Sequence, residues 1–324
     1  MRMRMMLLVA LSVAGLSLET AAQTYPSRPV TVVVPFPAGG PSDTLVRILG
    51  EHMRGTLGQP IVVENVAGAS GSIGAGRVAR AEPDGHTLIL GSWVTHVVNA
   101  AVYPLKYNVV DDFEPVSLVG TNPLLIVSKN SLPANDLKGL IAWLKANGDK
   151  ATQGITGAGT ALHIAGVSFK KETGTTHPFV SYKGGAPAIQ DLVAGQIDFM
   201  IDIAANALPQ VKAGNLKAYA VTSKERMGAA PDIPTVDEAG LPGFYAPNWY
   251  GVWAPKGTSK DVVARLNAAL VETLADPAVR QRLNAMGQEI TTREQQTPEA
   301  LGALHKAEIE KWWPIIKAAD IKGQ

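Results

Sequence analysis

The stretch "VVVPFPAGGPSD", residues 32–43, joins a β-branched run to a glycine turn and then to residues that can open a helix. Pro41 suits the first helical position, where a backbone N–H would have no intrahelical partner. Gly39 and Gly40 lack a Cβ atom, so a ligand oxygen can approach the backbone N–H groups of the turn. With the positive end of the helix dipole, this arrangement predicts an anion site. The alternative is a helix start that binds nothing, with Asp43 only capping the helix.

A second stretch, "GITGAGTALHIAG" at residues 154–166, repeats the arrangement. Strand residues give way to Gly157, Ala158, Gly159 and Thr160, and a helix follows with His163 in its first turn. The free amides of such a turn point beyond the carboxyl end of the strand. Two turns that face each other across a cleft could each hold one carboxylate. His163 either contacts the ligand or only packs and caps locally.

Between these turns and beyond them, short apolar runs alternate with amphipathic stretches. Continuous apolar strands separated by helices of this length favour parallel sheets covered on both faces. The fold class is therefore α/β, doubly wound. The expected strands are residues 30–36, 61–66, 86–92, 123–129, 152–156, 178–182, 197–202 and 216–223. The expected helices are residues 43–57, 72–81, 136–147, 161–173, 186–194 and 205–213.

After Ser223 the rhythm changes to a loop rich in Pro and Gly, residues 228–247, and then to three helical stretches near 259–275, 277–286 and 298–319. The last of these carries its apolar residues mostly on one face and should pack on a sheet. Trp312 and Trp313 on it are expected in the core rather than on a ligand. A chain of 324 residues fits about two domains.

The N-terminus predicts export. Arg2 and Arg4 precede an apolar run over residues 5–18, and small residues follow at Ala21 and Ala22. This pattern is typical of a secretory signal cut near Ala22, and the run is too short to span a bilayer. With no cysteine in the chain, neither disulfides nor a lipid-anchored cysteine is expected, and a Gram-negative periplasm fits best.

The charge balance argues against polyanionic partners. Of 29 basic and 28 acidic residues, removal of residues 1–22 takes two Arg and one Glu, which leaves 27 of each kind. Nucleic acid and anionic membranes both need a basic surface. Any anion site must therefore be local.

Motifs for catalysis, cofactors or metals are weak or missing. "GAGRVA" at residues 74–79 has the glycine spacing of dinucleotide folds, but it lies far behind the preceding strand and lacks the acidic residue about 20 positions on. There is no nucleophile elbow, phosphate loop or zinc-binding H-E-x-x-H motif. The six His residues show no metal-ligand spacing. We expect no enzyme, no cofactor and no metal.

An ordered series of motifs then becomes specific. It includes "YPSRPVTVVVPFPAGGPSD", "GQPIVVENVAGASGSIGAGRVARAEPDGHTLIL", "YNVVDDFEPVSLVG", "GAGTALHIAG", "VSYKGGAPAIQDLVAGQIDFMID" and "LKAYAVTSKERMGAAPDIPTVDEAGLPGF". Over essentially the whole mature chain, the sequence resembles the Bug-type substrate-binding proteins of the tripartite tricarboxylate transporter family.

The resemblance implies a two-domain periplasmic binding protein of the type II arrangement, with a ligand cleft between the domains. Domain 1 would comprise residues 23–120 plus 222–324, and domain 2 residues 121–221. The family grips a ligand carboxylate with two loops, largely through backbone N–H groups and water. Mapped here, these loops hold Phe36, Ala38, Gly39, Gly40 and Asp43 in one domain and Gly157, Gly159, Thr160 and His163 in the other. Family members commonly have Ser where this chain has Thr160.

Residues after other strands should set specificity, because open α/β sheets bind ligands at the carboxyl ends of their strands. The candidates are Ser70, Gly71, Ser92, Thr95, His96, Tyr182, Lys183, Gly184 and Asp202. For Ser92 and Thr95 the alternative is helix capping, and for Lys183 a solvated loop position. Trp93 or Tyr182 could stack on a planar acid or belong to the core.

The expected function is a monomeric periplasmic receptor that captures a small organic mono- or dicarboxylate for the membrane permease of a tripartite transporter. Three alternatives stay open: a ligand sensor that feeds a signalling partner, an exported hydrolase or isomerase, and a scaffold that binds a protein in its cleft.

Overall fold

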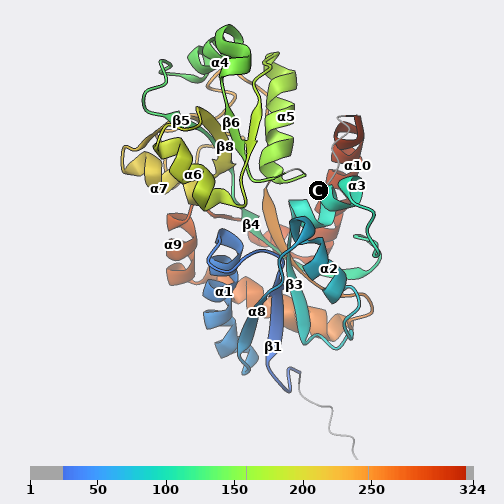
Figure 1. The fold of residues 1–324 in the computed structure, drawn as a ribbon. Coiled ribbons are helices and arrows are strands. Elements are labelled where there is room, and N and C mark those ends of the chain that lie inside the picture. The colour runs from blue at the N-terminus through green and yellow to red at the C-terminus, as the bar shows by residue number, and fades with distance from the viewer. Residues whose placement is uncertain (1–24, 158, 247, 319–324) are drawn as a thin grey trace, which may run out of the picture.

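The computed structural model describes residues 25–157, 159–246 and 248–318, so the expected export signal lies outside the described residues. Two lobes stand one above the other in Figure 1. One is built on a six-stranded sheet of order β11-β4-β10-β3-β1-β2, and the other on a five-stranded sheet of order β7-β6-β8-β5-β9. We call them lobe 1 and lobe 2.

The lobe 1 sheet is parallel at one side and antiparallel at the other. Its strands are β1 (Val30–Val34), β2 (Ile61–Asn65), β3 (Thr87–Ser92), β4 (Phe113–Thr121), β10 (Trp249–Pro255) and β11 (Glu289–Ile290). β1 is parallel to β2 and β3, whereas β10 runs antiparallel to β3 and β4. Four of the five β1 residues are buried, as suits a β-branched run covered on both faces.

Lobe 2 has the same mixed character. Its strands are β5 (Leu124–Lys129), β6 (Gln153–Ile155), β7 (Phe179–Ser181), β8 (Phe199–Ile203) and β9 (Leu216–Val221). β6 is parallel to β7 and β8, and β5 is antiparallel to β8 and β9.

The prediction of parallel sheets was therefore only partly right. The alternation of strands and helices in the sequence indicates parallel crossovers well, but it did not predict the strands β4, β10 and β11. β4 carries Pro115, which lacks a backbone N–H, and its pairing with β10 is interrupted by two register shifts. Such a strand has no clear local pattern in the sequence, because it forms by pairing with a strand more than 100 residues away.

Helices cover both faces of the lobe 1 sheet (Figure 1). One face packs on α1 (Pro41–Leu57), α8 (Lys260–Ala275) and α9 (Pro277–Ala285). The other packs on α2 (Ser72–Val78), the π-helical turn η2 (Val94–Val98), α3 (Asn99–Val102) and α10 (Pro298–Ala318). Trp312 on α10 is buried and Trp313 partly so, which confirms their expected place in the core.

Lobe 2 is covered by α4 (Leu137–Asn147), α5 (Ala161–Thr173), α6 (Gly185–Val193) and α7 (Ala204–Lys212). Short 3-10 turns complete the chain: η1 (Ala69–Gly71), η3 (Gly148–Lys150) and η4 (Arg293–Gln296). Among the described residues, no helix combines the length and the apolar character that crossing a membrane requires.

The chain passes between the lobes twice, from β4 to β5 and from β9 to β10. The two passages are tied to each other. Asn122 donates its backbone N–H to the carbonyl of Asn248 (2.8 Å), and the Asn248 side-chain amide donates to the carbonyl of Asn122 (3.2 Å). Both residues are buried. The two passages between the lobes are therefore hydrogen-bonded to each other at buried positions.

Candidate functional site: two glycine corners

The first corner connects β1 to α1 in lobe 1. Gly39 has φ +79° and Gly40 has φ −81°, so only Gly39 needs the conformational freedom of glycine. Among the described residues, a Cβ atom on Gly39 would meet nothing within 4 Å, and one on Gly40 would meet only the Pro37 carbonyl at 3.4 Å. In the described part of the chain, the first-turn amides of Ser42 and Asp43 find no acceptor. The corner therefore presents free donors beside open space.

Asp43 fixes the backbone of this corner through hydrogen bonds. Its carboxylate accepts the Gly39 N–H (2.9 Å) and forms two contacts of 3.0 Å with the Arg47 guanidinium. The Arg47 hydrogen bond, assisted by the Gly39 N–H, lowers the pKa of the Asp43 carboxyl despite its burial. Asp43 is thus ionised, 4% exposed and already occupied. Its carboxylate holds the Gly39 backbone in place, and no side chain caps the first turn of α1 within the described residues.

The other members of the first loop lie around the glycines. Phe36 is half-buried and its carbonyl accepts the Asn65 side-chain amide (3.1 Å), which holds the loop to the end of β2. Ala38 is exposed beside Gly39. The loop is thus anchored at both ends and open in the middle.

The second corner connects β6 to α5 in lobe 2. Gly157 and Gly159 have φ values of +105° and +74°. Thr160 caps the helix: its hydroxyl accepts the His163 N–H (3.3 Å) and donates to the Gly157 carbonyl (3.0 Å). The sequence places both glycines and the cap residue correctly, because each is dictated by local backbone geometry.

His163 plays the same role in the second corner as Asp43 does in the first. Its Nδ1 accepts the Gly159 N–H at 3.1 Å, so the ring proton of the neutral form resides on Nε2. Burial, aided by the nearby Lys170 charge, lowers the pKa of His163. His163 is therefore a neutral imidazole at neutral pH, with one N–H left to donate.

The two lobes meet beside this second corner. A Cβ atom on Gly159 would lie 3.3 Å from Cγ2 of Val102 and 4.0 Å from the hydroxyl of Tyr103, both at the end of α3 in lobe 1. Glycine at this position thus serves the turn and the close approach of the lobes. At Gly157, a Cβ atom would meet only Cγ2 of Thr160 among the described residues, so no large side chain of this part of the chain covers that position.

Ser92 and Thr95 form a closed pair where β3 passes into η2. The Ser92 N–H donates to the Thr95 hydroxyl (2.8 Å), the Thr95 N–H donates to the Ser92 hydroxyl (3.4 Å), and Thr95 Oγ1 also pairs with His96 Nδ1 (2.9 Å). All three side chains are buried. This is the capping alternative, and it leaves these hydroxyls no free surface toward a ligand.

Candidates in lobe 2 are also partly occupied. The Tyr182 hydroxyl donates to Asp191 of α6 (2.8 Å), and Gly184, at φ +145°, precedes that helix. Lys183 is exposed, as a solvated loop position would be.

Asp202 is fully buried at the end of β8. Its Oδ1 accepts the Ile203 N–H (2.8 Å), whereas its buried Oδ2 has no hydrogen-bond partner in the described residues. Burial raises the pKa of the Asp202 carboxyl to about 7. Asp202 therefore exchanges a proton near neutral pH.

Neither corner relies on a free cation from its own helix. Arg47 is held by Asp43, and the Lys170 amine lies 3.6 Å from the centroid of the Phe179 ring. In the described residues, no group of three or more His, Asp or Glu side chains could hold a metal ion. The donors available at the corners are backbone amides and the His163 Nε2–H.

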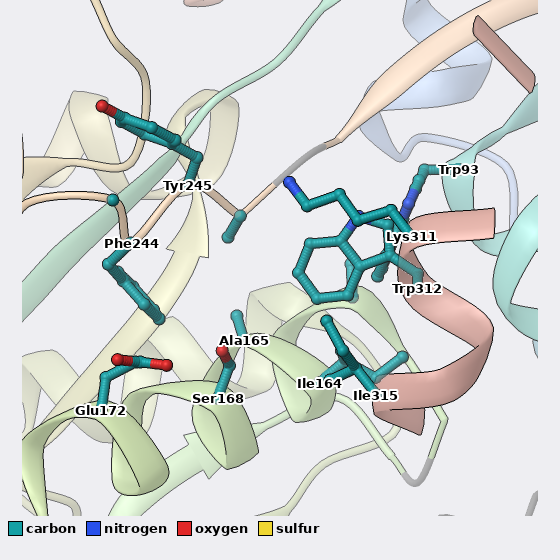
Figure 2. A pocket seen from close by; sticks show the side chains of 13 residues that line it. Trp93, Ile164, Ala165, Ser168, Glu172, Phe244, Tyr245, Lys311, Trp312 and Ile315 are labelled. Atoms are coloured by element: carbon teal, nitrogen blue, oxygen red, sulfur yellow. The ribbon is translucent and has the colours of Figure 1, made fainter. Parts of the chain in front are cut away.

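A cavity of about 130 Å³ lies between the lobes along α5, and Ala161, the first residue of that helix, is part of its lining. Figure 2 shows Ile164 from α5 beside Ile315 from α10, with Trp312 above them. Trp93 and residues 243–246 also line this cavity. Because its walls belong to both lobes, its shape depends on the angle between them.

Two residues of the site carried no sequence signal. Asn99 and Tyr103 on and after α3 hydrogen-bond Ser70, at 3.0 Å to its carbonyl and 3.1 Å to its hydroxyl. They come from a part of the chain about 30 residues beyond Ser70, and only the folded structure brings them together.

These features define the class: a two-lobed α/β periplasmic binding protein with glycine corners where the lobes meet. The family model of the tripartite tricarboxylate transporter family receptor, TctC, matches residues 45–321. The chain belongs to that family and is a solute-binding receptor of the Bug type.

Similar proteins agree. A protein from the TAR-I ttuE-ttuC' intergenic region of Agrobacterium vitis is 41% identical over 92% of this chain and 86% of its own length. The solved structure of MatC from Rhodopseudomonas palustris with bound malate is 40% identical, covers 90% of this chain and 100% of its own, and has a TM-score of 0.82. The periplasmic binding protein BugD is 41% identical, covers 93% and 100%, and has a TM-score of 0.83. An R. palustris protein with adipate is 32% identical, covers 92% and 99%, and has a TM-score of 0.84.

Proposed function

We propose that this receptor captures a small organic carboxylate between its lobes, with the two glycine corners as the binding groups. The observation that carries the proposal is that, within the described residues, Gly39 and Gly40 border open space and the first-turn amides beside them have no acceptor. The bound malate and adipate of two similar structures support the ligand class. Gly157, Gly159, Thr160 and His163 would complete the site from lobe 2.

Binding of a carboxylate at these corners does not require a lysine or arginine side chain in contact with the ligand. A carboxylate that accepts hydrogen bonds from preorganised amides gains roughly 1.5–3 kcal/mol for each charge-assisted bond. The positive ends of α1 and α5 add to this attraction. Such a grip is strong enough for capture, and it can be released when the lobes part.

The site supports binding rather than catalysis. At the second corner, Thr160 and His163 are the residues that could act as nucleophile and base, but the Thr160 hydroxyl donates to the Gly157 carbonyl and His163 Nδ1 accepts the Gly159 amide. A base whose lone pair is already used cannot take the hydroxyl proton.

The family and the two-lobed fold support a place in the periplasm and delivery to a membrane permease. In this proposal the N-terminal segment is removed near Ala22, the mature protein is a monomer, and lobe closure presents the loaded form to the permease. Of the candidates along the strand ends, Ser70 is partly exposed and could contribute its hydroxyl, whereas Asp202 is fully buried; Tyr182 and Gly184 would border the cleft.

Titration calorimetry on protein that has been unfolded and refolded to strip endogenous ligand tests the proposal. We expect heat with malate, succinate or adipate, competition among those that bind, and no product by mass spectrometry after incubation. Absence of binding to every acid in a wider carboxylate panel would overturn the proposal.

A further inference from the structure

The loop that carries Ser70 has an unusual backbone. Gly68, Ala69, Ser70 and Gly71 have φ values of +130°, +44°, +51° and +90° in succession. Ala69 and Ser70 are the non-glycine residues with positive φ in the described part of the chain. Side chains rarely tolerate this region, and such strain persists only where the surroundings enforce it, often at ligand clamps.

The surroundings do enforce it. The buried Asn99 donates its side-chain amide to the Ser70 carbonyl at 3.0 Å. Gly71 is wedged so tightly that a Cβ atom would lie 2.7 Å from Cγ2 of Thr95 and 3.1 Å from the Pro35 carbonyl. Pro35 directly follows β1 and leads into the first glycine corner. The loop is therefore fixed against the base of that corner.

The strained backbone delivers one functional group. Ser70 Oγ lies 3.1 Å from the hydroxyl of Tyr103, and both side chains are partly exposed. The same Tyr103 hydroxyl lies 4.0 Å from the Cβ position of Gly159 in lobe 2. The hydroxyl pair thus lies beside the second corner, where the lobes meet, and its loop packs against Pro35, which leads into the first corner.

We infer that the Ser70–Tyr103 pair binds a hydroxyl group of the ligand, so that the receptor is built for a hydroxy carboxylate; this rests on the proposed function. Two hydroxyls that bond each other use one proton between them and keep one to donate, together with free lone pairs. A ligand hydroxyl can accept that proton and donate its own. A carboxylate only accepts, and an ammonium only donates, so neither uses the pair fully.

Calorimetry with malate and succinate, which differ by one hydroxyl, tests the inference. Wild-type protein should bind malate more tightly. Tyr103→Phe should weaken malate binding about five- to tenfold, as expected for one neutral hydrogen bond, and leave succinate within about twofold. Ser70→Ala should give the same split, and alanine is tolerable there because Ala69 already adopts a similar backbone conformation.

Tyr107→Phe is the matched control. The Tyr107 hydroxyl is buried without a hydrogen-bond partner in the described residues, so its removal should leave both affinities unchanged. If Tyr103→Phe weakened the binding of malate and succinate equally, Tyr103 would have a structural role. That result, or unchanged malate binding, would overturn this inference and leave the proposed function standing. If wild-type protein bound neither malate nor succinate, the inferred hydroxy carboxylate would be wrong for these diacids. The proposed function would then be tested by the wider carboxylate panel.

Discussion

The backbone N–H of Gly159 donates to Nδ1 of His163, four residues on, at 3.1 Å. Lobe 1 repeats the relationship, with the Gly39 N–H on the Asp43 carboxylate at 2.9 Å. In both corners a glycine of positive φ is thus tied to the first turn of the following helix. In each corner one backbone amide is used in this internal hydrogen bond, which fixes the turn. The remaining amides are thereby held in an orientation that suits an anion.

His163 should contribute both an anchor and a donor. His163→Ala should weaken carboxylate binding by on the order of 1 kcal/mol or more, because it removes the acceptor for Gly159 and the Nε2–H. His163→Asn can keep an acceptor near Nδ1 but not the distal donor, so it should recover only the part due to the anchor. Calorimetry measures both variants, with the partly exposed His52→Ala as control. Wild-type affinity in His163→Ala would show that the ring only packs.

Gly40→Ala should block binding without unfolding the protein. The backbone at Gly40 suits any residue, and the new methyl group would project beside the corner with only the Pro37 carbonyl in contact. We expect a thermal midpoint near that of wild type and affinity at least about tenfold lower, equivalent to about 1.4 kcal/mol. Gly39→Val is a poorer probe because φ +79° would strain it as well.

The control for this change is Gly228→Ala, at an exposed glycine whose Cβ would meet no atom of the described residues within 4 Å. It should bind ligand like wild type. If Gly40→Ala binds as well as Gly228→Ala, the ligand does not lie at the first corner.

Asp202 should make stability depend on pH. Its folded pKa of about 7 exceeds its usual value of 3.8, so between these values the folded state holds a proton that the unfolded state has released. Its contribution therefore falls as pH rises from about 4 to about 7 and stays low above that. Asp202→Asn removes the buried charge and should raise the free energy of unfolding at pH 8 by on the order of 2 kcal/mol.

Urea unfolding at about pH 8 and about pH 4.5 measures this, and the advantage of Asp202→Asn should shrink at the lower pH. A pH-independent difference between the variant and wild type would contradict the raised pKa. Loss of ligand binding in the same variant would add a direct role for the carboxyl in the site.

Ligand binding should change tryptophan emission. Trp93 and Trp312 line the cavity shared by α5 and α10, whose shape follows the angle between the lobes. Closure on a carboxylate should therefore shift or quench their fluorescence. Trp312→Phe should remove much of the signal while calorimetry shows unchanged affinity, whereas Trp143→Phe, on α4 of lobe 2, should keep it. A full signal in Trp312→Phe would place the reporting indole elsewhere.

Local signals predicted most helices and the parallel strands, because apolar periodicity and glycine or proline punctuation act within a few residues. They also located Gly39, Gly40, Gly157, Gly159 and Thr160 at the turns where the structure has them. They did not find the antiparallel β4 and β10, or distinguish the occupied Ser92 and Thr95 from free hydroxyls. Those outcomes depend on partners that the local pattern does not name.

The amino-acid sequence by itself determined the α/β class, the two glycine corners and the family, since each is written in short contiguous motifs. Only the tertiary structure decided that Asp43 and His163 serve as anchors, that one buried oxygen of Asp202 has no partner among the described residues, and that Ser70 meets Tyr103. The physical reason is that hydrogen bonding and desolvation depend on which atoms surround a group, and long-range packing supplies those atoms.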